Sequence, residues 1–598
     1  FLADDSADAF ANVVDRLLAS PHYGERWGRH WLDVARYADS NGLDENVVHG
    51  NAWRYRDYVV RSLNNDKPYD EFVVEQLAGD LLDSGDDFAI RNERLIATGF
   101  LVLGPKVLAE QDEAKMEMDI IDEQIDTVGR SIMGLTLGCA RCHTHKFDPI
   151  SHHDYYGLAG IFKSTQTMDS YKTVAKWHEN TIATAEQAAG LEQHQQQIAA
   201  QETQIADQVA EAKATLDPPP ASDAKPEEIE KQFPAETQTE LKELRDELKQ
   251  LQDATPALPT AMGVTEGKIA DTSVHLRGSH LTLGDVVPRR VPEVLAIDDQ
   301  PPIPADHSGR LEFARWLTSG NHPLTARVMV NRIWQFHFGR GIVRSSNNFG
   351  QLGTPPTHPE LLDWLAQTFI QSGWKVKDMH RLMMNSRAYQ MSSASHDEGL
   401  ATDPGNDLFW RFDPRRLSAE EVRDSILAVN GSLNPSVYGP SFYEKLSAEV
   451  LAGQSRPGQG WGDSPEEQRN RRSIYIHVKR SLLTPLLSAF DFPDPDLTCE
   501  ARFATLQPGQ ALSLLNSDFI HDQATKFAKS IDAASVGNDE VVRRAIKVAF
   551  ARQATDAEIA DGDALIKKLV STDGITRQRA VSLYCLTVMN WNEFLFVD

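Results

Sequence analysis

Apolar residues recur three or four positions apart along most of the chain, the spacing that places them on one face of an α-helix. Residues 10–18 and 27–35 show this pattern, and we interpret Trp27 and Trp31 as core residues. From residue 115 to 134, apolar residues at 118, 121, 125 and 128 form one stripe, opposite acidic residues at 119, 122, 123 and 126. The acidic side is interpreted as a solvated face rather than a cation site, because hard cations usually draw ligands from a turning loop.

Residues from about 180 to 255 carry a different pattern, which predicts a long helical arm. Leu191, Ile198, Ile205 and Ala212 repeat every seven residues, and a later run beginning at Leu241 has leucines at alternating spacings of three and four. Such spacings are typical of a coiled-coil seam. Because the proline-rich segment 217–228 separates the two runs, we predict a protruding antiparallel coiled-coil hairpin that serves as a spacer or partner contact.

The rest of the chain divides around this arm. Residues 261–310 alternate short apolar runs with glycine and proline, which predicts a small β element or extended strap, and residues 311–598 return to helical patterns. The predicted fold class is mainly α: a multidomain helical protein with a protruding antiparallel coiled-coil hairpin and a small β element. The predicted segments are a helical domain at 1–175, the arm at 176–260, the strap at 261–310 and a helical C-terminal domain at 311–598.

Composition narrows the class of protein. The 598 residues are 41% hydrophobic with a mean hydropathy of −0.41, and no apolar run predicts a transmembrane segment. A formal net charge of −27 argues against a partner nucleic acid, which needs a basic face. Four cysteines are too few for a disulfide framework. The chain begins at Phe1 just before a helical pattern, so we expect it to be part of a longer precursor.

The strongest chemical signal is the segment Cys139-Ala140-Arg141-Cys142-His143. This is the C-x-x-C-H spacing of c-type haem attachment, in which two thiols bond to one porphyrin and the following histidine binds its iron. Half of a zinc site and a structural thiol pair remain alternatives; a zinc ion needs four ligands, and the other candidate ligands nearby are histidines at 145, 152 and 153.

Longer blocks of sequence resemble a known family. The block around the motif reads GLTLGCARCHTHKFDPISHHDYYGLAGIF, and an earlier block reads LLASPHYGERWGRHWLDVARYADSNG. Both resemble the planctomycete-type cytochrome c domain family. Three later blocks resemble the C-terminal partner domain of unknown function that usually follows it: HPLTARVMVNRIWQFHFGRGIVRSSNNFGQLGTPPTHPELLDWLA, RRSIYIHVKRSL and FDFPDPDLTCEARFATLQPGQALSLLN.

This resemblance implies one haem c, attached covalently through Cys139 and Cys142, within a c-type haem domain at 1–175. It also implies export to the periplasm or cell envelope, with a redox partner protein or an upstream cytochrome domain as partner. The family signature has aspartate where this chain has Thr144, which leaves a carboxylate role there in doubt. His143 is the expected iron ligand, and His145, two residues further on, is expected to touch a propionate or support the site.

The second iron ligand has several candidates. Met118, Met133 and Met168 could supply a thioether, His30 could supply a second imidazole, and an iron without a second protein ligand could react with peroxide or oxygen. Three polar residues, Arg36, Asp39 and Arg141, are candidates beside such an open iron. Met and His residues at helical spacing usually pack in the core, so core packing is the competing interpretation for each of the methionine and histidine candidates.

Two weaker signals lie outside the motif. A polar series at 322, 327, 331, 332 and 337 follows one helical stretch; it predicts buried hydrogen bonding or, alternatively, a substrate cleft at the junction of the two family-like halves. Cys499 and Cys585 are interpreted as buried thiols, with their pairing left open.

Taken together, these patterns predict an exported c-type haem protein for electron transfer or haem-based redox chemistry in the cell envelope, with a haem-dependent oxidoreductase as its enzymatic form. No catalytic residue is identified. The alternative prediction is a structural or interaction protein of an envelope assembly, in which residues 180–255 mediate homo- or hetero-oligomerisation and haem or another metal has a structural role.

Overall fold

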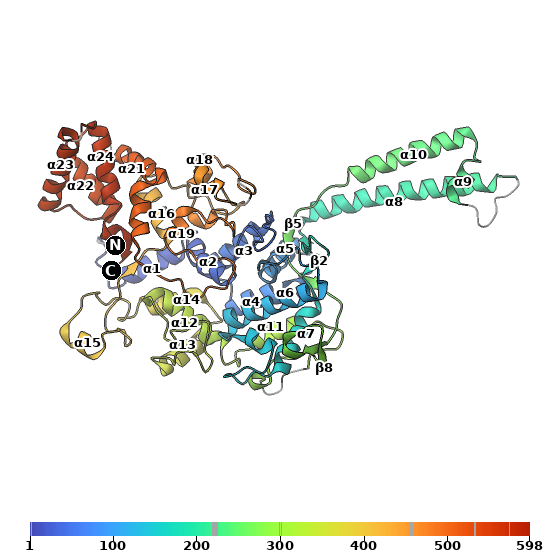
Figure 1. Cartoon of the computed structure of the whole chain (residues 1–598), viewed down its shortest axis with the longest axis horizontal. Coiled ribbons are helices and arrows are strands. Elements are labelled where there is room, and N and C mark those ends of the chain that lie inside the picture. The colour runs from blue at the N-terminus through green and yellow to red at the C-terminus, as the bar shows by residue number, and fades with distance from the viewer. Residues whose placement is uncertain are drawn as a thin grey trace.

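The computed structural model describes residues 1, 3–217, 225–297, 300, 302–454, 456, 458–531, 534–572 and 574–597. It is mainly α-helical, as predicted, with a helical body and an arm that extends from it (Figure 1). Most of the predicted proline-rich breaker, residues 218–224, lies outside the described residues. In the part of the chain that is described, no helix is both long and apolar enough to span a bilayer.

In the described part of residues 1–175, the α-helices α1 to α7 build the body, and α2 packs extensively against α3. Gly24 on α2 permits this contact, because a Cβ there would lie 2.2 Å from the carbonyl oxygen of Val60 on α3. The bounds of the seven are α1 Ala9–Leu18, α2 Tyr23–Val34, α3 Ala52–Asn64, α4 Tyr69–Ala78, α5 Phe88–Ala97, α6 Glu113–Val128 and α7 His152–Lys163.

Helix α6 matches its predicted apolar stripe, since Met118, Ile121, Ile125 and Val128 are all buried. The prediction of a solvated acidic face holds only in part, since the Asp119 side chain is 42% exposed and that of Glu123 is 24% exposed. Its carboxylates are partly covered and form ion pairs with arginines brought in by other segments and by the next helical turn: Arg36 with Glu123, Arg130 with Asp126, and Arg141 with Asp119 and Asp122. A helical wheel shows the acids but cannot show which cations the fold places against them.

The arm consists of α8 (Ala185–Ala214) and α10 (Ala235–Asp253), joined through the short α9 (Pro226–Glu230). The two long helices run antiparallel: His194 hydrogen-bonds the Leu251 carbonyl at 2.8 Å near the base, and Gln208 donates to Glu240 at 2.6 Å further out. The outer end has a small core of Ala212, Ile229, Phe233 and Leu241. The arm leaves the body between paired strands β4 (Glu179–Thr181) and β5 (Thr260–Met262), so its two ends are adjacent.

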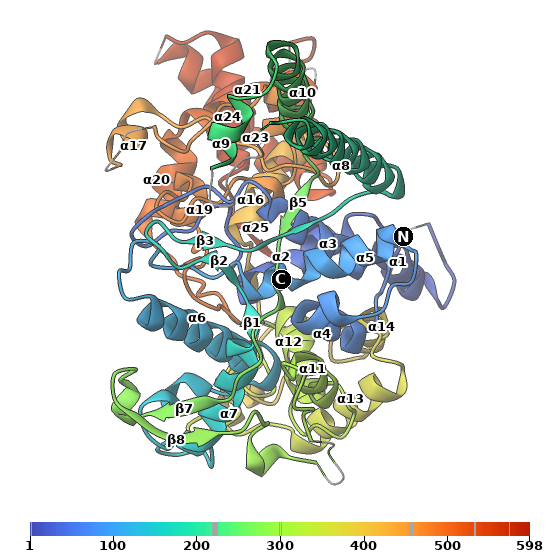
Figure 2. The ribbon, with the colours of Figure 1, turned by 90° about the vertical axis from the view of Figure 1, so that its right-hand side faces the viewer.

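The predicted small β element is present as short antiparallel pairs spread over the body. The pair nearest the motif is β7 (Thr272–His275) with β8 (Leu283–Val287), which packs against α7 (Figure 2). The other pairs are β1 Thr165–Gln166 with β6 Thr265–Glu266, β2 Met168–Ser170 with β3 Lys176–Trp177, and β9 Arg415–Arg416 with β10 Phe596–Val597.

The C-terminal part is a succession of helices whose apolar faces join the same core as the N-terminal helices. One continuous cluster of buried residues runs from Trp31 to Phe594, so residues 1–175 and 311–598 share a single hydrophobic interior. The helix bounds are α11 Arg310–Leu317, α12 Thr325–Phe338, α13 Pro359–Gln371, α14 Val376–Met384, α15 Asp397–Thr402, α16 Ala419–Val429, α17 Ala448–Ala452, α18 Glu466–Arg469, α19 Pro485–Ala489, α20 Pro508–Asn516, α21 Asp518–Ser530, α22 Asn538–Phe550, α23 Asp556–Ser571, α24 Arg577–Val588 and α25 Asn592–Leu595.

Buried charges also join the two parts. Arg502 donates to Asp33 on α2 at 2.6 and 3.0 Å and to Glu420 on α16 at 2.6 and 2.8 Å. Arg29 on α2 donates to Asp33 as well, at 2.7 Å. Two carboxylates and two guanidinium groups from three distant segments therefore form one network inside the body.

Candidate functional site

The C-x-x-C-H motif lies in the connection between α6 and α7. After α6 the backbone makes one wider helical turn at Gly129–Met133 and then reverses at Gly134. Gly134 has a left-handed φ of +62°, and a Cβ there would lie 2.8 Å from the Phe349 ring, so glycine is required to end the helix here. The motif follows on a short 3-10 turn, Leu137–Arg141.

The motif presents its reactive groups on the surface. Cys139, Cys142 and His143 are exposed, whereas Ala140 between the thiols is buried and anchors the turn. Both cysteines are free thiols. The two thiols and the imidazole are therefore accessible from solvent.

The hydrogen bond of His143 decides which of its nitrogens is available. Its Nδ1 lies 2.7 Å from the carbonyl oxygen of Thr144. A carbonyl only accepts hydrogen bonds, so Nδ1 carries the proton and Nε2 keeps its lone pair. A metal-binding histidine is normally held in this way, with the distal nitrogen directed to the metal by a hydrogen bond at the other.

His145 is buried and holds the loop that follows the motif. Its Nδ1 accepts hydrogen bonds from the backbone N–H groups of Asp148 at 2.8 Å and Phe147 at 3.3 Å, and its Nε2 lies 3.4 Å from Thr136 Oγ1. Both ring nitrogens thus have partners, the Asp148 and Phe147 N–H groups after the motif and the Thr136 hydroxyl before it. The contact of His145 with a porphyrin stays a prediction.

Arg141, in the middle of the motif, fixes the turn to both flanking helices. Its guanidinium donates to Asp119 at 2.7 Å and Asp122 at 3.1 Å on α6. Its carbonyl oxygen accepts hydrogen bonds from Tyr156 Oη and His152 Nε2 on α7, each at 3.0 Å. His152 therefore holds the motif's backbone, and Arg141 is a positioning residue, not a free polar group beside the site.

Sequence reasoning did not identify the β7–β8 hairpin as a neighbour of the motif. Gly278, at its tip, has a φ of +76°, and a Cβ at that position would lie 2.6 Å from Cys142 Sγ. The same hairpin carries exposed apolar side chains, Leu281 being 80% exposed. The alternation of apolar residues in this segment marked a strand, but no local signal places it beside a motif so far away in the sequence.

These observations fit the attachment of a c-type haem. The thiols are free and exposed, the His143 Nε2 lone pair is available, and an apolar hairpin lies beside them. Within the described residues, no group of three or more His, Cys, Asp and Glu side chains is arranged to hold a metal ion, so the zinc alternative finds no further ligands there.

The candidate second ligands pack as core residues. Met118 and Met133 are buried in the main core, and Met168 is buried in a small cluster beside it. His30 stacks on Phe336 with ring centroids 3.5 Å apart, and burial lowers the pKa of its imidazole. Arg36 and Asp39 are also buried: Arg36 pairs with Glu123, and Asp39 accepts hydrogen bonds from Tyr37 Oη and the Val478 N–H.

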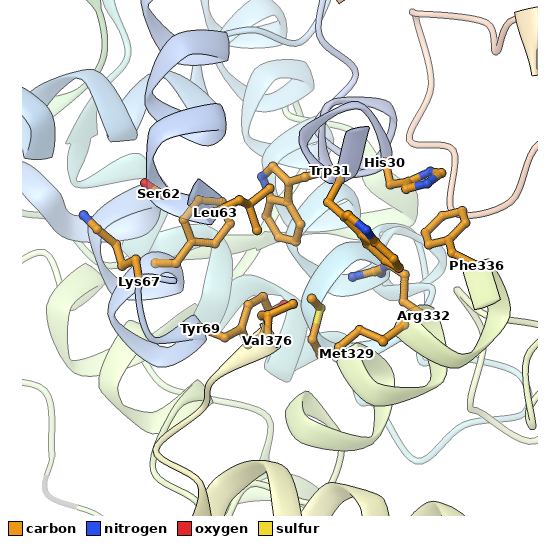
Figure 3. Close-up of a pocket in the computed structure, with 13 residues that line it drawn as sticks. His30, Trp31, Ser62, Leu63, Lys67, Tyr69, Met329, Arg332, Phe336 and Val376 are labelled. Carbon is orange, nitrogen blue, oxygen red and sulfur yellow. The ribbon is translucent and has the colours of Figure 1, made fainter. Parts of the chain in front are cut away.

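The polar series begins at His322, just before α12, and most of its members form the predicted buried hydrogen bonds; Arg327 instead pairs with Asp363 at the surface. Asn331 exchanges hydrogen bonds with the backbone of Val343, and burial lowers the pKa of His322 to about 3. Arg332 is different, because it lines a pocket between α2 and α12 (Figure 3). Of the remaining cysteines, Cys585 is buried as predicted, Cys499 is half-buried, and both are free thiols.

Comparison with protein-family models supports the resemblance at a coarse level. Residues 1–167 match a family described as PSCyt2, Protein of unknown function (DUF1549). Residues 309–566 match a second family described as PSD1, Protein of unknown function (DUF1553). The two matches stand in the order expected for the planctomycete cytochrome c and partner domain pair. No curated protein and no solved structure matches the chain.

Proposed function

We propose that this chain is an exported c-type haem protein that transfers electrons or performs haem-based redox chemistry in the cell envelope. The observation that carries the proposal is the outward-facing group of Cys139, Cys142 and His143, with the His143 Nδ1 proton bound by the Thr144 carbonyl. The family name of the segment 1–167 and its cytochrome-like sequence blocks support it.

In this proposal the chain's residues have distinct roles. Cys139 and Cys142 would hold the porphyrin through thioether bonds, and His143 Nε2 would bind the iron. Arg141 and His152 keep the turn in place, so that the three attachment points do not drift apart. The haem itself would supply a one-electron couple, whose potential depends on the second ligand and on exposure to water.

Covalent attachment is the first test. The chain is exported to the periplasm of a host that carries a cytochrome c maturation system, and the mass of the denatured protein is measured by mass spectrometry. We expect the mass of one added haem and a reduced-minus-oxidised spectrum of the c type. Replacing Cys139 and Cys142 together by alanine abolishes both, whereas C499A, a matched control, retains them. A bare polypeptide mass after maturation contradicts the proposal.

A second measurement separates an electron carrier from a catalyst. Carbon monoxide is added to the reduced protein, and the absorption spectrum is compared before and after. A shift shows an open sixth position and favours a haem-dependent oxidoreductase. An unchanged spectrum shows two protein ligands and favours electron transfer.

The arm supports a second candidate function, an assembly role in the envelope. We propose that α8 and α10 form a coiled-coil hairpin whose leucine seam contacts a partner helix, because the pair extends away from the body and Leu244, Leu248 and Leu251 are only half-buried in it. The partner is a second copy of the chain or another envelope protein.

The arm can be removed without breaking the body. Because β4 and β5 are paired at its base, residues 185–253 can be replaced by a short Gly-Ser turn. Light scattering after gel filtration then gives the mass of the assembly. A smaller assembly mass supports the second candidate, and an unchanged mass with unchanged partners contradicts it.

A further inference from the structure

The hairpin of β7 and β8 carries apolar side chains on both of its faces. Its inner face packs against α7, with Val274 and Val287 buried. A hairpin with one face in water normally has apolar residues inside and polar residues outside. Here the exposed positions are apolar as well, and these aliphatic side chains are 45–80% exposed: Leu276, Leu281, Leu283 and Val286. An uncovered apolar surface of this kind is typical of a binding surface.

The tip of the hairpin contacts the second thiol of the motif. Gly278 lies at the tip, and a Cβ at that position would be 2.6 Å from Cys142 Sγ. Glycine therefore leaves room there for the sulfur and for a group bonded to it. Leu276 precedes this glycine by two residues and Leu281 follows it by three, so exposed aliphatic side chains flank the point of contact.

Polar contacts fix the hairpin against the motif. Tyr156 Oη on α7 lies 3.0 Å from the carbonyl oxygen of Arg141 and 3.4 Å from that of His275, so one phenol joins the motif to β7. Beyond the tip, His280 Nε2 lies 2.8 Å from a carboxylate oxygen of Asp112, the residue that caps α6. The apolar surface of the hairpin is therefore held in place beside the two thiols.

The tip also carries a positive charge that no described carboxylate neutralises. Arg277 is exposed, and its side chain forms no ion pair with any residue in the part of the chain that the structure describes. A haem has a broad apolar face and propionate carboxylates along one edge. An aliphatic surface with a guanidinium at its end is complementary to that combination, because guanidinium groups form strong hydrogen bonds to carboxylates.

We propose that the exposed aliphatic surface of the β7–β8 hairpin binds a face of the porphyrin attached at Cys142, and that Arg277 receives a propionate. This inference rests on the haem attachment proposed above and assigns the attached group a binding surface from a distant part of the chain. Covalent attachment at the thiol that the hairpin touches gives the porphyrin a high effective concentration there, an advantage that a partner protein lacks. Because exposure to water is one determinant of a haem's potential, the hairpin would also tune its redox chemistry.

The first test maps the hairpin with a photoactivated diazirine that labels exposed side chains. The full chain is prepared with haem, by export and maturation, and without haem, by cytoplasmic expression, and labelled peptides are quantified by mass spectrometry. We expect residues 276–286 to lose most of their label when haem is attached. Leu400 on α15 and the neighbouring Leu408 are exposed and lie far from β8, so their labelling should not change (Figure 1).

The outcomes separate this inference from the haem proposal itself. A matured chain whose mass lacks haem contradicts the attachment and removes the inference with it. A chain that carries haem but keeps full labelling at 276–286 overturns the hairpin assignment alone. Label that disappears only after another protein is added would also overturn it, because the surface would then belong to a partner.

A pair of serine substitutions tests the aliphatic side chains. L281S/L283S changes exposed residues, so without haem its unfolding temperature should equal that of the wild type. With haem attached we expect a lower unfolding temperature than in the wild type, because the hairpin no longer offers the ring an apolar cover. L400S/L408S is the matched control and should behave like the wild type in both forms. A shift for L281S/L283S that is equal with and without haem would overturn the proposal.

Arg277 is tested in the same way. R277Q should lower the unfolding temperature of the haem-loaded chain and leave that of the haem-free chain unchanged. Wild-type unfolding temperatures in both forms would overturn the assignment of the propionate to Arg277. If the haem-free chain does not fold, the comparison of L281S/L283S with L400S/L408S in the haem-loaded chain decides the question.

Discussion

Removing Arg502 should destabilise this protein far more than removing a surface arginine that makes as many hydrogen bonds to carboxylates. Arg502 makes four hydrogen bonds to two carboxylates, those of Asp33 and Glu420. Arg552 also makes four, to Glu558 and Glu593. The pairs differ in burial: the Arg502 side chain is 15% exposed and that of Arg552 is 35% exposed.

The burial difference sets the magnitudes. R502M leaves two buried carboxylates that share only Arg29, and breaking a buried pair costs about 3–5 kcal/mol. R552M leaves carboxylates that water can solvate, and such surface pairs contribute about 0–1 kcal/mol. Urea unfolding followed by circular dichroism measures the free energy of unfolding of both variants. Equal losses in the two would refute the reasoning from burial.

The same experiment has a pH arm. In the wild type, burial raises the pKa of Glu420, but Arg502 and Arg29 more than reverse this and hold it below its usual range. Without Arg502 the opposing cation is lost, so the pKa of the orphaned carboxyl rises and protonation relieves the unpaired charge. We therefore expect the deficit of R502M to shrink as pH falls from 7 to 5. A deficit that is constant over this range would contradict the electrostatic explanation.

Other predictions concern single positions. Burial raises the pKa of Asp424 to about 6, above about 3.9 in an unfolded chain, so its charge destabilises the folded state above pH 6 and this penalty fades as pH falls to 4. D424N should remove this pH dependence of the free energy of unfolding, worth about 3 kcal/mol, because the amide is uncharged but keeps the hydrogen bond from Ser473. Unfolding curves at several pH values would test it. G24A should lower the free energy of unfolding by at least about 1–3 kcal/mol, because its Cβ would lie 2.2 Å from the Val60 carbonyl oxygen. G190A, in the open arm, should instead stabilise α8 by about 0.5–1 kcal/mol. Thermal unfolding measures both changes. In haem-free native protein, iodoacetamide should label Cys139 and Cys142 before Cys499 and Cys585, as peptide mass spectrometry would show; uniform labelling would contradict their exposures.

The spacing of apolar residues predicted the helices better than it predicted which side chains meet between them. The apolar stripe of α6 and the two helices of the arm follow from spacing alone, because each depends on local geometry along one helix. The partners of charged residues do not follow from spacing. Arg141 and Asp122 meet only because the chain turns back between α6 and α7. The spacing of residues along a helix thus predicts which of them share a face, whereas ion pairs between segments depend on the whole path of the chain.

The candidate site shows the same division. The C-x-x-C-H spacing identified the motif from the sequence, but the hydrogen bond that orients His143 and the Gly278 approach to Cys142 depend on loop conformation and on a distant hairpin. The small pocket between α2 and α12 matches the sequence only as a predicted cleft between the two family-like halves, because its lining comes from helices far apart in the chain.

The shared interior has a consequence for how such chains are inherited. Two family models divide this protein, yet Trp31 and Phe594 belong to one core, and Asp33, Glu420 and Arg502 form one charge network. A gene encoding either segment alone would yield a product with a large open apolar face and stranded buried charges, prone to aggregation. The two segments are therefore expected to travel together through gene duplication and recombination, whereas the arm, inserted between adjacent strand ends, is free to vary in length.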